Sequence, residues 1–494
     1  MPVRLSALPC LLLSVAATAS HAATPSNAPA ACWNAAARRD MQFAIDTLRN
    51  SHAGVAGGKL DASAPLDTGA RSAMIEAEQV QTERDYRRAM MRFIASFGDP
   101  HTGINLNLKT EAWTGVVLDQ RDGQYRVIWS EPGWPHALPP VNAVAQSCDG
   151  VWTGTYIKTS VAPYSKFSTE YAAAASTHAQ SMMFEQGLGH TPKRCTFTLP
   201  DGSARSYDLP LRPVAEIGME RIRTVRKTYQ AQARAPGLYP LAKGMHLVGM
   251  PNFDGAKSGA AYEKVYVELA KLRAAQWIVF DLRGNGGGNS TWGTRALQAL
   301  YGDAYGEQLS DMPAYGKRMV AAPASIALFR QFADAPENAA YRDSYLKTAH
   351  RLETAVQQGE RLAVLEDSTE ADNLALGAKV RQRPGGPRLA AVIDRNCFSS
   401  CMAFLQQLRA IGDTVVLGEP TWGYSPYGEI AGFDLPSGNG ALYIASALYA
   451  SPQATREPFV PDLAYRGNMA DDAALTTWVA KTLAKTKPGL KPHD

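Results

Sequence analysis

The sequence offers little that would mark a membrane, nucleic-acid or metal protein. Beyond residue 22, no apolar stretch reaches the ~20 residues that a helix needs to cross a bilayer. The 50 basic and 46 acidic residues leave a net charge of only +4, too small to predict binding to nucleic acid or to a membrane surface. No CxxC pair and no HExxH segment occurs, so we expect neither a metal nor a cofactor.

The first residues have the composition of a secretory signal peptide. Within residues 1–22, Arg4 precedes an apolar run at 11–15, and small residues follow around Ser20. Such a segment is removed on export, so we expect a periplasmic or secreted protein that is not integral to a membrane. Export also permits disulfides, and five cysteines remain after residue 22: Cys32, Cys148, Cys195, Cys397 and Cys401.

The residue pattern changes several times along the remaining chain. Residues 113–213 have short alternating runs split by Gly, Pro and Asp-Gly turns, which predict a small β-rich domain. From 214 to 494, strands alternate with helices and predict an α/β core, interrupted by a charge-rich helical insert at about 303–384. Residues 23–112 predict a helical region, because apolar residues recur at helical spacing: Trp33, Met41, Ile45, Leu48, Tyr86, Met90, Phe93 and Phe97.

The most informative stretch runs over residues 277–293. An apolar strand ends in Asp281 and opens into four glycines within 284–288, followed by a helix. Backbone N–H groups at a helix N-terminus favour negative charge, so this loop could hold a phosphate or a developing oxyanion. A dinucleotide site, and hence an oxidoreductase, is disfavoured because Asn289 replaces the third glycine of that fingerprint and because an exported protein rarely meets free NAD.

A second junction lies at residues 389–411, where a buried strand runs into a helix that begins near Ser399. Serine at this position is typical of an N-cap, since its hydroxyl accepts a hydrogen bond from the first helical turn. The same position would suit a nucleophile, because the N–H of Ser400 would point at the group under attack. Spacing alone does not choose between them. No GxSxG segment occurs, so an α/β-hydrolase elbow is not expected.

Four motifs, in order, resemble one known family. They are DLRGNGGG at 281–288, SSC at 399–401, GEPTWG at 418–423 and VPDL at 460–463. Together they resemble the C-terminal processing protease and tricorn-core family of serine peptidases. The resemblance implies a crotonase-like α/β core, a degenerate PDZ-like domain in the β-rich segment, a protein or peptide substrate, and Ser399 as the nucleophile.

The resemblance also bears on the base. Members with a Ser–Lys dyad carry lysine directly after the GEPTWG-like turn, whereas this chain has Tyr424. A phenol is mostly protonated at neutral pH and is a poor base. The histidine-using branch places its base in a D-x-H segment, which Asp99 and His101 resemble, and this implies His101 as the base. Without the resemblance, His101 would be taken as a turn histidine after a helix end, and His52 is a competing candidate.

The remaining site residues are also implied by the resemblance. Glu457, shortly before the VPDL motif, would orient the histidine, although a surface Arg–Glu pair is the alternative interpretation. The oxyanion hole would combine the N–H of Gly286 or Gly287 with that of Ser400. The sequence thus predicts an exported serine endopeptidase. The alternative is a non-catalytic peptide- or ligand-binding protein that keeps the same fold.

The cysteines give an independent expectation. Cys148 and Cys195 both belong to the β-rich segment and are the natural pair. Cys397 and Cys401 lie one helical turn apart, where a Cα separation of ~6 Å permits a disulfide around Ser399. Cys32 would then be the leftover thiol.

Overall fold

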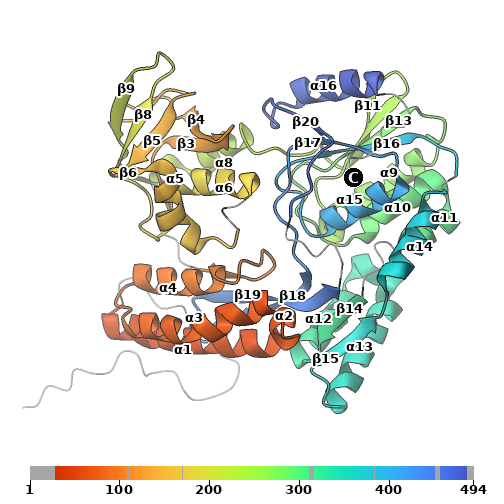
Figure 1. Cartoon of the computed structure of the whole chain (residues 1–494), viewed down its shortest axis with the longest axis horizontal. Helices are drawn as coiled ribbons and strands as arrows, with labels where there is room; N and C mark the ends of the chain where they lie inside the picture. The colour runs from red at the N-terminus through yellow and green to blue at the C-terminus, as the bar shows by residue number, and fades with distance from the viewer. Residues whose placement is uncertain are drawn as a thin grey trace, which may run out of the picture.

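The computed structural model describes residues 28–107, 111–167, 169, 171–310, 316–382, 384–450 and 457–486. The expected signal peptide at 1–22 lies outside these residues. Figure 1 shows a β-rich group of elements at upper left, an α/β group at upper right and a helical group at the bottom. No helix within the described ranges is both long enough and apolar enough to cross a membrane.

A six-stranded sheet forms the centre of the α/β group. Its order is β11-β12-β13-β16-β17-β20, and every neighbouring pair is parallel except β11 with β12. The strands are β11 (Gly237–Ala242), β12 (Met245–Gly249), β13 (Trp277–Asp281), β16 (Arg388–Ile393), β17 (Val415–Gly418) and β20 (Leu463–Ala464). The flanking helices are α9 (Gly255–Leu269), α10 (Thr291–Tyr301), α15 (Ser400–Ile411) and α16 (Asp472–Lys485).

Both faces of this sheet are covered, because successive side chains of β13 point to opposite faces. Ile278 and Phe280 pack into the core formed with α9, α10 and α15. Trp277 and Val279 pack on the other face, against α16. A strand buried on both faces reads as a continuous apolar run, which explains why residues 277–280 contain no charged or hydroxyl side chain.

The helical group packs on a second, antiparallel sheet in which β19 pairs with β1, β14 and β18. The apolar residues expected to form the helical core are buried, and they contact Leu442 and Ile444 of β19. The helices are α1 (Ala30–Ser51), α2 (Ala53–Ala56), α3 (Leu60–Glu78) and α4 (Glu83–Ala95). The strands are β1 (Gly103–Leu106), β14 (Gly316–Val320), β15 (Leu362–Glu366), β18 (Tyr427–Asp434) and β19 (Gly440–Ala450).

The β-rich group contains the strands that its alternating pattern predicts. Its main sheet has the order β3-β4-β5-β8-β9, with β6 paired to β5. These strands are β3 (Val116–Arg121), β4 (Gln124–Ser130), β5 (Val144–Cys148), β6 (Val151–Trp152), β8 (Arg194–Thr198) and β9 (Ala204–Asp208). A small sheet of β2 (Ala112–Trp113), β7 (Phe184–Glu185) and β10 (Arg212–Pro213) and the helices α5 (Thr153–Tyr156), α6 (Ala172–Met182), α7 (Val214–Ile217) and α8 (Met219–Lys227) complete it.

Two features differ from the expected layout. The stretch at 303–384 contains the helices α11 (Asp303–Ser310), α12 (Pro323–Asp334), α13 (Arg342–Gln357) and α14 (Glu370–Val380), but also the strands β14 and β15. The strand β19, expected to continue the α/β core, instead pairs antiparallel with β14 and β18. Both differences have one cause. The strand β14 pairs with β19, which lies far away in the sequence, and a local residue pattern does not reveal such a pairing.

Both expected disulfides are present. Cys148–Cys195 joins directly facing residues of β5 and β8. Cys397–Cys401 joins the loop after β16 to the first turn of α15. No cysteine in the described part of the chain is free, so the expectation of a leftover thiol at Cys32 is wrong.

Candidate active site

The glycine loop and the loop before α15 lie against each other because their strands are neighbours. β13 and β16 are adjacent and parallel, so their carboxyl ends reach the same edge of the sheet. The N–H of Phe398 donates to the carbonyl of Asn285 at 3.1 Å. The hydroxyl of Ser400 donates to the carbonyl of Gly288 at 2.6 Å. The two junctions identified in the sequence therefore form one site.

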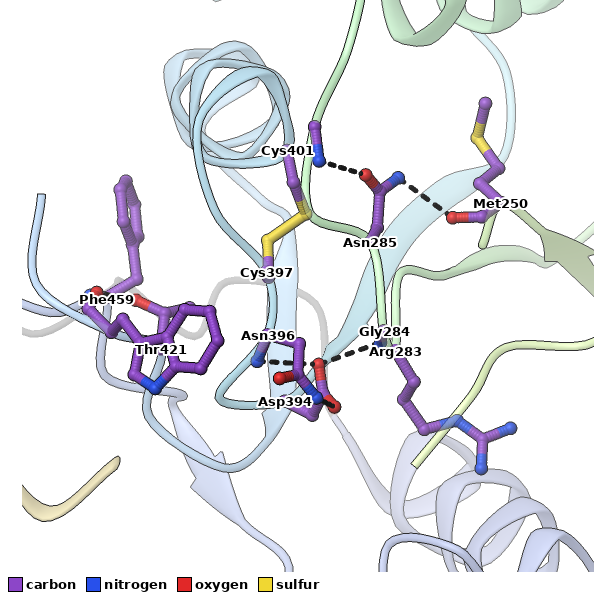
Figure 2. Close-up of a disulfide and its surroundings, with 12 residues drawn as sticks. Met250, Arg283, Gly284, Asn285, Asp394, Asn396, Cys397, Cys401, Thr421 and Phe459 are labelled. Carbon is purple, nitrogen blue, oxygen red and sulfur yellow. Dashed lines mark hydrogen bonds between the residues drawn. A yellow bond between two sulfur atoms is a disulfide. The ribbon is translucent and has the colours of Figure 1, made fainter. Parts of the chain in front are cut away.

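The side chain of Asn285 fixes the glycine loop from inside. It is fully buried, and its Nδ2 donates to the carbonyl of Met250 at 2.9 Å. Its Oδ1 accepts the N–H of Gly287, also at 2.9 Å. Because a buried amide that loses its partners is costly, these bonds hold the loop in one arrangement (Figure 2).

Asp394, directly after β16, ties the glycine loop to the segment that leads into α15. Its Oδ1 accepts the N–H of Gly284 at 2.9 Å and that of Asn396 at 3.2 Å. Its Oδ2 accepts the side-chain amide of Asn396 at 2.8 Å (Figure 2). Burial raises the pKa of Asp394 to about 6, and these hydrogen bonds oppose the shift. The buried carboxyl group thus connects the two loops through hydrogen bonds.

Ser399 has a strained backbone at the start of α15. Its φ of 56° and ψ of −125° lie in a region that residues other than glycine rarely adopt. Its hydroxyl makes no capping bond to the helix. Gly287 lies directly against it, since a Cβ built on Gly287 would be 2.8 Å from Cβ of Ser399 and 3.0 Å from the nitrogen of Ser400. This geometry disfavours the N-cap explanation.

Ser399 and His101 line the same cleft, which has a volume of about 650 Å³. Ser400 and Tyr424 line it as well, so the structure brings together most of the side chains singled out in the sequence. The cleft walls come from the glycine loop, α10, α15, the insert and the sheet of β18 and β19. Residues that share it without a sequence motif include Lys317, Glu429 and Tyr449.

His101 lies between α4 and β1 and is 8% exposed. Its ring faces that of Phe398, with centroids 4.6 Å apart. Its Nδ1 is buried and has no hydrogen-bond partner among the described residues. Burial lowers the pKa of His101, and the charge of Asp99 opposes this shift. The ring is therefore neutral near pH 7, which is the form that a general base requires.

Asp99 holds the turn that carries His101. Its Oδ1 accepts the backbone N–H of His101 at 3.1 Å and the hydroxyl of Ser425 at 2.6 Å. Its Oδ2 accepts the hydroxyl of Thr102 at 2.7 Å. Burial alone would raise the pKa of Asp99, but its contact with His52 and the charge of His101 hold it well below the usual range. The carboxylate stays ionised and keeps the turn fixed.

His52, the competing candidate for the base, has a structural place. Its Nδ1 accepts the N–H of Gly54 at 3.1 Å and so caps α2. Its Nε2 lies 3.5 Å from Oδ2 of Asp99, and both side chains are almost fully buried. His52 is not among the described residues that line the cleft. His52 therefore contacts Asp99 in the turn that carries His101 and is not placed to act on Ser399 as a base.

Glu457 is not brought to His101. Its side chain is exposed, and it is absent from the described residues that line the cleft. Its backbone carbonyl accepts the N–H of Tyr424 at 3.3 Å. The cleft carboxylate that acts electrostatically on His101 is Glu429 of β18. No sequence motif indicates Glu429, which lies in an ordinary strand pattern.

The glycine N–H groups expected for the oxyanion hole differ in their surroundings. The N–H of Gly287 is donated to Asn285, so it would have to leave that bond to serve a substrate. Gly286 faces open space, with no atom within 4 Å of the position that a Cβ would take. The nitrogen of Ser400 lies beside Gly287, and Ser400 lines the cleft, whereas Gly286 and Gly287 are absent from its described lining residues.

Comparison with known proteins agrees with this architecture. The sequence model of peptidase family S41 matches residues 245–463, the stretch from β12 to β20. No curated protein matches the chain in sequence. The structure of mature CPAF complexed with lactacystin is similar, with a TM-score of 0.63, 11% identity, and coverage of 92% of this chain and 99% of that chain. Mature CPAF alone gives a TM-score of 0.60 and 13% identity over 92% of this chain and 96% of that chain.

At such identities the likeness to CPAF shows the fold, a mixed α/β arrangement with several sheets. The family match covers the stretch that contains both loops of the cleft, including the glycine loop and Ser399. Residues 245–463 therefore form a peptidase family S41 region, and the protein is a serine-type peptidase.

Proposed function

We propose that the protein is an exported endopeptidase in which Ser399 is the nucleophile and His101 the general base. The hydroxyl oxygen of Ser399 attacks the scissile carbonyl carbon while His101 takes its proton. His101 then returns the proton to the leaving amine, and water hydrolyses the acyl-enzyme by the same route. The observation that carries this proposal is the strained backbone of Ser399, whose uncapped side chain opens onto the cleft that His101 lines.

The oxyanion hole in this proposal combines the N–H of Ser400 with one from the glycine loop. Ser400 follows the nucleophile at the N-terminus of α15, where the helix dipole favours negative charge. Gly286 or Gly287 would supply the second donor. The space beside Gly286 is open, whereas Gly287 would first exchange its bond to Asn285 for one to the substrate.

Three further parts of the proposal rest on sequence resemblance and on the disulfides. We propose that the parallel sheet and its helices form a crotonase-like core and that the β-rich group is a degenerate PDZ-like domain. The two disulfides are compatible with export to a periplasmic or external compartment. The substrate would be a protein or peptide.

Covalent labelling tests the nucleophile. We expect an alkyl fluorophosphonate to form one adduct, located on Ser399 by mass spectrometry of the folded, processed protein. Ser399→Ala should abolish the adduct, while Ser400→Ala should keep it on Ser399. His101→Ala should slow labelling at neutral pH because the hydroxyl loses its base. Absence of any adduct on well-folded protein would favour the alternative, a peptide-binding protein without turnover.

A further inference from the structure

Glu429 has an unusual backbone for a strand residue. Its φ is 52°, although it lies inside β18 between residues that pair regularly with β19. A residue with a side chain keeps such a sparsely populated conformation only where the surrounding structure enforces it. The hydroxyl of Ser446 donates to the carbonyl of Glu429 at 2.6 Å and helps to hold it. The Glu429 side chain lines the cleft.

Two neighbours fix the carboxylate of Glu429 through one of its oxygens. Nζ of Lys317 lies 2.7 Å from Oε1, and the hydroxyl of Tyr449 donates to the same oxygen at 3.2 Å. All three residues line the cleft. Burial would raise the pKa of Glu429, but Lys317 and Tyr449 lower it below the usual range, so the carboxylate is ionised at neutral pH.

One ring nitrogen of His101, Nδ1, has no hydrogen-bond partner among the described residues, although the backbone of Tyr427 also acts on the ring. If Nε2 of His101 serves Ser399, its Nδ1 should be held by an acceptor, as the third member of a triad does. Nδ1 is buried without such a partner among the described residues. The charged groups that act on His101 are Asp99, Lys166 and Glu429. Asp99 is already committed to backbone and hydroxyl donors, and Lys166 carries the wrong sign.

We propose that Glu429 is the positioning carboxylate for His101, held ready by Lys317 and Tyr449. This inference rests on the proposed Ser399–His101 chemistry and names a residue that the family motifs do not indicate. On substrate binding, the free oxygen of Glu429 would orient the ring and stabilise the imidazolium that forms when Ser399 attacks. Glu457 is exposed and is absent from the described residues that line the cleft. Among the glutamates that do line it, Glu307, Glu366 and Glu429, it is Glu429 that acts on His101.

The test compares variants by the rate at which an alkyl fluorophosphonate labels Ser399, measured from pH 4.5 to 8.5. Glu429→Gln should slow labelling by about 10-fold to 100-fold and move its rise with pH to lower values, because a negative charge near His101 is lost. Glu353→Gln is the control, since Glu353 pairs with Arg330 and is absent from the described residues that line the cleft. It should leave rate and pH profile unchanged.

Glu429→Gln alone leaves Lys317 buried without its counter-ion and could unfold the protein. The double variant Glu429→Gln/Lys317→Met removes both charges and should fold, yet it should be as slow as Glu429→Gln. In a His101→Ala background, Glu429→Gln should add less than about a 3-fold further loss, because the two act as a unit.

The outcomes separate the two proposals. If wild-type protein is not labelled, or if His101→Ala labels as fast as wild type, the Ser399–His101 assignment itself fails. If labelling depends on His101 but Glu429→Gln and the double variant keep the wild-type rate and pH profile, only the role of Glu429 is overturned. A loss in Glu457→Gln with none in Glu429→Gln would also overturn it.

Discussion

Ser399 is held in a backbone conformation that costs free energy, and contacts with neighbouring residues keep it there. A non-glycine residue in such a region carries about 1–3 kcal/mol of strain. Gly287 leaves room for it, since any side chain there would meet Ser399 and Ser400. The buried amide of Asn285 in turn fixes Gly287 through its N–H. At the scale of single residues, the site therefore depends on close backbone contact between two loops.

A pair of alanine substitutions in the glycine loop tests this contact. Gly287→Ala would place a methyl group 2.8 Å from Cβ of Ser399 at a φ of 98°, so we expect at least about a 100-fold loss of kcat, comparable to losing one oxyanion donor. Gly286→Ala meets no atom within 4 Å and should cost less than about 3-fold. Peptidase assays compare kcat of the two variants, and their melting temperatures show whether each variant is folded. Equal losses would contradict the close-contact account.

The pH dependence of kcat/KM tests the identity of the base. Burial lowers the pKa of His101, and the base works only when neutral, so the rate should rise with pH through a value below 6.5 and be flat by neutral pH. Tyr424→Phe should leave this rising limb in place. A limb well above pH 7 that disappears in Tyr424→Phe would instead identify the phenol as the base.

At the scale of secondary-structure elements, the strand–loop–helix units were predictable and their long-range partners were not. The strands β12, β13 and β16 and the helix α15 follow from apolar runs and periodicity in the sequence. The pairing of β14 with β19 joins residues more than a hundred positions apart, so no local pattern could reveal it. Glu429 carries no motif for the same reason, since its place in the cleft depends on the pairing of β18 with β19.

The residues of the candidate site likewise fall into those that the sequence predicts and those that only the structure reveals. Ser399 and His101 carry motifs, and both line one cleft together with Gly288 of the glycine loop. Gly286 and Gly287 are absent from the described residues that line it. The resemblance implies Glu457 only through its place shortly before the VPDL motif, and its side chain is exposed. The choice between N-cap and nucleophile for Ser399 needed the backbone angles, which depend on packing between two loops and not on residue type.

The two disulfides should differ in what they support. Loop closure predicts about 2 kcal/mol for the 4-residue separation of Cys397 and Cys401 and about 4 kcal/mol for the 47-residue separation of Cys148 and Cys195. The first bond, however, encloses Ser399. Cys397→Ala/Cys401→Ala should therefore lower kcat more than Cys148→Ala/Cys195→Ala, which should lower the melting temperature more. Activity and melting curves of the two variants check this, and the reverse ranking would contradict it.

At the scale of the whole molecule, the β-rich group is joined to the active-site core by ion pairs from β3. A guanidinium nitrogen of Arg395, four residues before Ser399, lies 3.1 Å from Asp119, whose side chain is only 2% exposed. Arg395 also lies 3.4 Å from Glu419. The separate pair of Asp122 and Arg466 is more than 80% exposed on both sides. The ion pair of Asp119 with Arg395 thus connects the β-rich group to the loop that leads to Ser399.

Substitutions in the buried and the exposed ion pair test whether the buried pair stabilises this connection. Asp119→Asn should lower the free energy of unfolding by about 3 kcal/mol, because it leaves the largely buried Arg395 without a full counter-ion. Asp122→Asn should change it by less than about 1 kcal/mol, because water screens the exposed pair. Denaturant unfolding of both variants measures this. Similar effects of the two substitutions would show that the buried pair is not what joins the groups.

The central claim is that Ser399 and His101 act as one catalytic unit, and a double-mutant cycle tests it most directly. We would measure kcat/KM for Ser399→Ala, His101→Ala and the double variant on a peptide substrate identified by proteomic profiling against Ser399→Ala. Each single substitution should cost at least about a thousandfold, and the double variant should be barely slower than Ser399→Ala. If the two losses multiply instead, His101 acts in substrate binding or folding, and the Ser399–His101 assignment is contradicted.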